Sequence, residues 1–146
     1  MFNLEIKTFI SSLLSSNMYT IKSEKKLIVI DPFVSVELLD YIEGNLLTVD
    51  YIILTHEHYD HISGVNWLKD KFNTKVICND KCAEAIINPA LNFSKYFNIL
   101  FELMPKGKGT NIPKEIVPYS CFSDITFKDN MTIDWVENKF LYSRIY

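Results

Sequence analysis

The sequence contains little glycine, little proline and only three cysteines. Four glycines and five prolines in 146 residues exclude a collagen-like chain and a linker-like chain, which both need these residues in abundance. An odd number of cysteines without a secretion signal does not predict a disulfide framework. We therefore expect a protein of a reducing compartment, the cytoplasm.

Long apolar runs and clustered positive charges are also missing. The longest stretch without a charge, residues 8–21, contains four serines and an asparagine, so it does not predict a membrane span. Glu5 lies where a signal peptide would carry positive charge. The net charge is −3 and the basic residues form only short groups, whereas a nucleic-acid-binding protein usually presents a basic face. We expect neither a membrane nor a nucleic acid as partner.

The composition and the pattern of apolar residues predict a single globular domain over residues 1–146. Hydrophobic residues make up 48% and charged residues 23% of the chain, which is typical of folded proteins. Short apolar or alternating runs predict strands, and runs at helical spacing predict helices. Strands that alternate with helices indicate an α/β fold. We expect strands at 4–10, 17–22, 27–30, 51–54, 75–78 and within 122–146, and helices at 36–42, 65–72 and 81–88.

All three histidines lie within six residues, in the sequence His56-Glu57-His58-Tyr59-Asp60-His61. In an extended segment, residues two apart point to the same side, so His56 and His58 can converge on one metal ion. A turn at Tyr59-Asp60 would direct Asp60 and His61 toward a second ion. Imidazole and carboxylate ligands suit Zn²⁺, and Mn²⁺ and Fe²⁺ accept the same donors.

Two other interpretations of this segment are weaker. The helical metalloprotease motif H-E-x-x-H would need a histidine at position 60, where the chain has Asp60. A solvated surface loop without chemistry would need three histidines and an aspartate to gather by accident. We therefore interpret the segment as a metal-binding loop.

The pattern His56-x-His58-x-Asp60-His61, with Gly64 three residues further on, resembles the signature of the metallo-β-lactamase superfamily. Asp31 follows the preceding apolar run and is similar to the family's strand-end aspartate, which holds the metal-binding loop in place without binding the ion itself. The resemblance covers roughly residues 1–142. The small size and the opening strands are most similar to the glyoxalase II-like hydrolases of the family.

This resemblance implies a four-layer αββα sandwich with a metal centre at one edge. In that family, His56 and His58 would bind the first ion, and Asp60 and His61 the second. A metal-bound hydroxide would then attack an ester, thioester, amide or phosphodiester of a small-molecule substrate, because a metal lowers the pKa of bound water from 15.7 toward about 7. Asp60 would also orient that nucleophile or take its proton.

The chain departs from the family pattern after His61. The family adds later histidines and a bridging aspartate, whereas this chain has no histidine beyond His61. We therefore expect a sandwich that is incomplete at its C-terminus, and whether this chain is an active enzyme stays open. One alternative is a truncated, inactive fragment that self-associates through an exposed sheet edge. Another is a metal-binding or interaction module whose missing ligands come from a partner chain.

Two further features have simpler interpretations. Cys78 and Cys82 are expected as small apolar residues of the core, and Cys121 is a poor substitute for a missing ligand. The sequence Lys106-Gly107-Lys108-Gly109-Thr110 departs from the P-loop pattern, since Glu102 lies where that pattern needs a glycine. We expect a solvated loop there.

Overall fold

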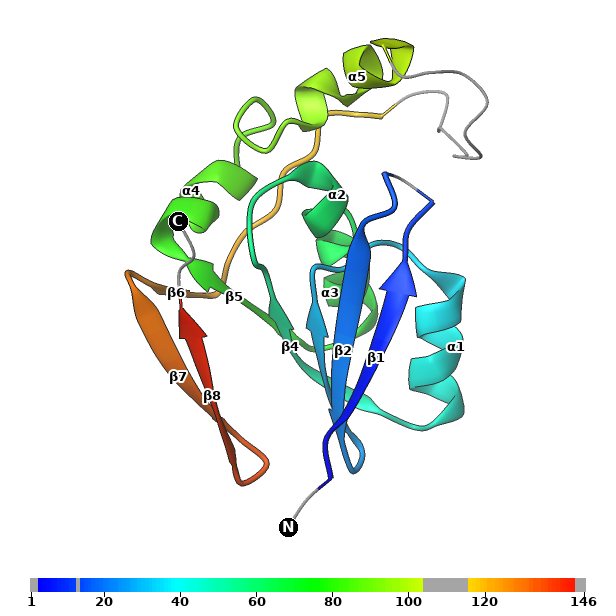
Figure 1. The fold of residues 1–146 in the computed structure, drawn as a ribbon, viewed down its shortest axis with the longest axis vertical. Coiled ribbons are helices and arrows are strands. Elements are labelled where there is room, and N and C mark those ends of the chain that lie inside the picture. The colour runs from blue at the N-terminus through cyan, green and yellow to red at the C-terminus, as the bar shows by residue number, and fades with distance from the viewer. Residues whose placement is uncertain (1–2, 13, 104–115, 144–146) are drawn as a thin grey trace.

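A six-stranded sheet forms the centre of the fold (Figure 1). The computed structural model describes residues 3–12, 14–103 and 116–143. The strands follow one another across the sheet in chain order; the first two pairings are antiparallel and the next three parallel. The strands are β1 (Glu5–Ile10), β2 (Asn17–Ser23), β3 (Lys26–Ile30), β4 (Thr48–Ile53), β5 (Lys75–Asn79) and β6 (Ile125–Phe127).

The helices connect the parallel strands and continue beyond β5. They are α1 (Val36–Gly44), α2 (Tyr59–Ile62), α3 (Val65–Lys71), α4 (Asp80–Ile86), the 3₁₀ helix η1 (Ser94–Tyr96) and α5 (Phe97–Leu103). Ser35 caps α1 by accepting a hydrogen bond from the Leu38 amide. Gly44 is the last helical residue of α1, and the Asn45 side chain after it donates to the Tyr41 carbonyl.

The parallel strands β3 and β5 are buried on both faces, as their apolar runs predict. Leu27 and Val29 of β3 face the helices, whereas Ile28 between them faces the opposite side. On the helix side they pack with residues such as Leu38 of α1 and Leu68 of α3. These strands therefore need a cover on each face.

A hairpin of β7 (Asn130–Trp135) and β8 (Asn138–Ser143) covers part of the second face. Ile133 and Trp135 are buried against Ile28 and Ile77 of the large sheet. The Trp135 Nε1 also donates a hydrogen bond to Asp50, at 2.7 Å, across 85 positions of the chain. The order helix, sheet, second sheet confirms the α/β prediction and the layer order expected for the sandwich.

One edge of the large sheet is exposed, which bears on self-association. β1 is an edge strand of the large sheet, and its Ile6 and Ile10 side chains are 68% and 70% exposed. Exposed edge strands favour pairing with other chains, and self-association through this edge stays a prediction.

No helix in the described part of the chain is long and apolar enough to cross a membrane. The basic loop at 106–110 lies outside the described residues.

Gly64 allows two loops to pack backbone against backbone. Its amide donates to the Pro32 carbonyl at 2.8 Å, directly after Asp31. A Cβ at this position would lie 2.7–2.8 Å from backbone atoms of Phe33, which is closer than such atoms approach in real structures. The absence of a side chain at position 64 therefore lets the segment after the histidines lie against the end of β3.

We predict that Gly64→Ala lowers the free energy of unfolding by about 2 kcal/mol or more, because the clash is with backbone and cannot be relieved by a side-chain rotation. Gly44→Ala is the matched control, since a Cβ there meets nothing within 4 Å. Alanine in a helix is favoured by up to about 1 kcal/mol over glycine, so this control should be neutral or stabilising. Urea unfolding of both variants tests the prediction, and equal stability of Gly64→Ala and the wild type would contradict it.

Candidate metal centre

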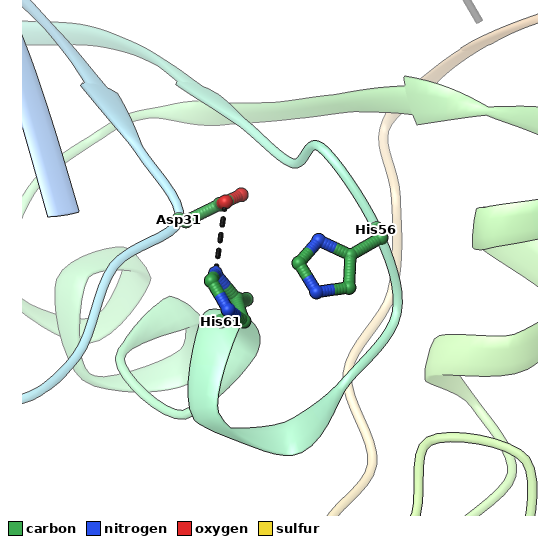
Figure 2. A group of neighbouring side chains, drawn as sticks. All are labelled: Asp31, His56 and His61. Atoms are coloured by element: carbon green, nitrogen blue, oxygen red, sulfur yellow. Dashed lines mark hydrogen bonds and ion pairs between the residues drawn. The ribbon is translucent and has the colours of Figure 1, made fainter. Parts of the chain in front are cut away.

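The candidate site lies at the carboxyl ends of β3 and β4, where parallel strands present loops at one edge of a sheet. Asp31 directly follows β3. Thr55 and His56 follow β4, and Asp60 and His61 belong to α2. Figure 2 shows the Asp31 carboxylate and the rings of His56 and His61 gathered in one place. Two buried strands and one helical turn thus bring the side chains together.

Asp31 is the most buried member of the group, at 4% exposed. One carboxylate oxygen accepts a hydrogen bond from the Thr55 amide at 2.8 Å, and the other accepts from the Thr55 hydroxyl. This second oxygen also lies 3.0 Å from Nδ1 of His61. The backbone of Asp31 has a φ of 54°, in the left-handed region that aspartate tolerates better than most residues. The carboxylate therefore ties the ends of two strands to α2.

The three histidine rings lie next to one another. The His56 ring centroid is 4.0 Å from that of His61 and 4.8 Å from that of His58. One potential ligand atom each of Asp31, His56 and His61 lies within 4.8 Å of the other two, the one such group of three or more in the described part of the chain. The structure thus adds Asp31 to the atoms close enough to share an ion, and places His58 and Asp60 beside this group.

Asp60 and His61 have the spacing of two ligands on one ion. The distance between Asp60 Oδ2 and His61 Nε2 is 3.4 Å. With bond lengths of about 2.0–2.2 Å, neighbouring ligands of a tetrahedral zinc ion lie about 3.4 Å apart. Because Nδ1 of His61 faces Asp31, its Nε2 is the nitrogen on the Asp60 side. This donor pair fits a zinc ion.

The local backbone explains how residues so close in the sequence come to lie around one site. His58 is extended and forms the N-terminal cap position of α2, and the His61 amide donates to the His58 carbonyl at 2.8 Å. The turn expected at Tyr59-Asp60 is therefore one helical turn, α2, inside a segment for which we predicted only a loop. Asp60 and His61 project from this turn, while His56 and His58 precede it.

The surroundings shift the pKa values of two histidines in opposite directions. Burial and the neighbouring His61 lower the pKa of His56, which favours its neutral form. For His61, burial opposes the charge, but the hydrogen bond and the charge of Asp31 outweigh it and raise the pKa. Neutral imidazole is the form that binds metals.

Two residues of this site were not predicted from the sequence. The Ser16 hydroxyl, from the loop between β1 and β2, donates a hydrogen bond to Oδ2 of Asp60. The Thr55 hydroxyl contacts both Asp31 and His56. Thr55 directly precedes His56 after an apolar strand, a position that could have drawn attention to it. Nothing in the local sequence marks Ser16, which is 44 positions from its partner.

The cysteines lie in the core, as expected for Cys78 and Cys82. Cys78 is in β5 and Cys82 in α4, and both are buried in the cluster between the sheet and the helices. Cys121 is also buried there, and burial raises the pKa of its thiol to about 12. Cys121 is therefore a residue of the same core cluster as the other two.

Comparison with solved structures gives the fold. The crystal structure of the BLEG-1 B3 metallo-beta-lactamase matches with a TM-score of 0.70 and 22% identity, over 95% of this chain and 59% of that chain. A metallo-beta-lactamase superfamily protein of Sulfolobus tokodaii matches with a TM-score of 0.55 and 18% identity, over 88% of this chain and 50% of that chain. At these identities the likeness concerns the fold alone.

Curated relatives match over shorter segments. Hydroxyacylglutathione hydrolase 1 of Vibrio vulnificus (strain YJ016) is 41% identical over 61 residues, which are 42% of this chain and 25% of that protein. Hydroxyacylglutathione hydrolase of Prochlorococcus marinus (strain MIT 9312) is 33% identical over 84 residues, 56% of this chain and 34% of that protein. The matched segments thus span about a quarter to a third of these relatives.

The sequence model described as "Metallo-beta-lactamase superfamily" matches residues 12–136, a range that includes Asp31, the histidine segment and Gly64. The match covers most of the chain and agrees with the helix, sheet, second-sheet order of the fold. The chain therefore belongs to the metallo-beta-lactamase superfamily.

Proposed function

We propose that this chain carries the metal-binding loop of a zinc-dependent hydrolase that acts on a thioester or a related ester. The observation that carries the proposal is the gathering of the three histidine rings beside the Asp31 carboxylate, with Asp60 Oδ2 3.4 Å from His61 Nε2. The thioester is favoured because the curated relatives are hydroxyacylglutathione hydrolases.

Each residue has a role in this proposal. His56 and His58 hold a first ion, and Asp60 and His61 hold a second. Asp31 orients His61 by accepting from Nδ1, which leaves Nε2 for the metal. Bound zinc would lower the pKa of a water molecule and polarise the scissile carbonyl. Asp60, held in place by the Ser16 hydroxyl, would orient the attacking water or accept its proton.

A second candidate function is a metal-binding module that obtains further ligands from a partner chain. The observation that favours it is that all three histidines lie in one six-residue segment. Catalytic zinc sites normally have three protein ligands and a water, whereas the first ion here has two histidines. In the described residues, the cysteines that could add a ligand are buried in the core.

We predict that replacing His56 and His58 together by alanine abolishes zinc binding. Two of the four proposed ligands are lost, and the remaining pair, Asp60 and His61, holds an ion too weakly. Zinc content after dialysis, measured by atomic absorption, tests this. The control is the double variant Asp134→Ala, Lys139→Ala, an exposed pair on the hairpin. Zinc at unchanged stoichiometry in the histidine variant would refute the assignment.

We predict that Asp31→Asn lowers zinc affinity about 10–100-fold, as is typical when a group that orients a metal ligand is changed. Asparagine tolerates the left-handed backbone of position 31, so this variant removes the charge without adding strain. Asp31→Ala loses both the acceptor and the favoured backbone, and should also unfold more easily. Competition with a chelator measures the affinity, and equal values for Asp31→Asn and wild type would remove the orienting role.

We predict that the 146-residue chain alone, loaded with zinc, hydrolyses thioester, ester and phosphodiester model substrates poorly or not at all. Two protein ligands leave the first ion, and hence the attacking water, badly positioned, and a misplacement of about 1 Å can lower a rate on the order of 100-fold. Turnover assays on monomeric protein test this. Zinc-dependent turnover of about 1–1,000 s⁻¹, lost in His58→Ala, would show that the residues present suffice.

A further inference from the structure

Thr55 occupies a position between Asp31 and His56 that the roles assigned above leave unused. Its hydroxyl oxygen contacts Oδ2 of Asp31 and lies 2.8 Å from Nδ1 of His56. Its amide donates to the other carboxylate oxygen of Asp31 at 2.8 Å, which holds the residue in place. Thr55 is therefore the one described residue whose hydroxyl joins this buried carboxylate to a histidine ring.

A hydroxyl has a single proton, so it can donate to one of these two neighbours only. An ionised carboxylate can only accept, and two oxygens in contact with no proton between them would repel each other. The Thr55 hydroxyl must therefore donate to Asp31. Its oxygen then acts as an acceptor toward His56, and Nδ1 of His56 must carry the proton.

We infer that Thr55 is a positioning residue that holds His56 in the Nδ1–H tautomer, so that the lone pair on Nε2 is available to a metal ion. This inference rests on the proposed metal-binding function of His56. Asp31 accepts a hydrogen bond directly from Nδ1 of His61. It acts on His56 through the Thr55 hydroxyl, which donates to Asp31 and accepts from Nδ1 of His56. The Asp31 carboxylate thus leaves Nε2 of both His56 and His61 available to a metal ion.

The exposure of Thr55 determines how large an effect we expect when its hydroxyl is removed. Thr55 is an exposed residue, so a water molecule can replace part of the contact when the hydroxyl is removed. We expect the loss of affinity to be at the lower end of the range for residues that orient metal ligands, about 10-fold. Removal of the hydroxyl should therefore change the tautomer of His56 more completely than it changes the zinc affinity.

The test uses Thr55→Val, which keeps the shape and removes the hydroxyl, and Thr55→Ser, which keeps the hydroxyl. Thr20→Val is the matched control, because it removes a hydroxyl from β2 whose partner, the Lys7 carbonyl, belongs to the sheet and not to the site. Long-range ¹H–¹⁵N correlation spectra of the metal-free protein report the tautomer of each ring. With three histidines in the chain, the His56 signals are assigned by their loss in His56→Ala.

The wild type, Thr55→Ser and Thr20→Val should show His56 as the Nδ1–H tautomer. Thr55→Val should shift it toward the Nε2–H form that imidazole side chains prefer in water, with zinc affinity lowered about 10-fold in chelator competition. An Nε2–H tautomer in the wild type, or an unchanged Nδ1–H tautomer in Thr55→Val, would overturn the inference. Failure of the wild type to bind zinc would instead refute the proposed function, and the spectra of the metal-free protein would still decide the role of Thr55.

Discussion

The buried carboxylate of Asp31 is the interaction on which the site depends. A charge at 4% exposure is unfavourable unless its oxygens accept hydrogen bonds. Here the Thr55 amide, the Thr55 hydroxyl and the His61 ring satisfy it. The dependence is mutual, because the carboxylate holds the end of β4 and the first turn of α2 in place. The arrangement of His56 and His61 follows from this one group.

Asp31 is itself positioned by the packing of the sheet. The apolar run of β3 is buried on both faces, so the strand cannot shift along its neighbours without exposing one set of side chains. Pro32 follows directly, and its carbonyl accepts from the Gly64 amide. The close contact of Gly64 with Phe33 then brings the segment after His61 back to the start of the same loop. Fold and site are therefore held by shared contacts.

Much of this arrangement could be predicted from the sequence, for identifiable reasons. The apolar runs of β3, β4 and β5 have few other possible structures, and the histidine segment is specific enough to indicate the family. α2 was missed because four residues are too few to show a helical period. Ser16 was missed because its contact with Asp60 spans 44 positions and depends on tertiary packing. The left-handed backbone of Asp31 and the double contact of Thr55 likewise arise only when β3 and β4 lie side by side.

The hairpin of β7 and β8 has a consequence for the order in which the protein can form during synthesis. Ile28 and Ile77 are buried by Ile133 and Trp135 of the hairpin. The Trp135 side chain also donates a hydrogen bond to Asp50, 85 positions earlier in the chain. Ribosomes add about 5–20 residues per second, so on the order of 3–12 s pass between the synthesis of Ile77 and that of Trp135. During this interval the nascent chain can already pair β1 through β5 and bring Asp31 to the histidines, while one face of its sheet is still bare. The metal loop can therefore be assembled before the hairpin covers this face of the sheet.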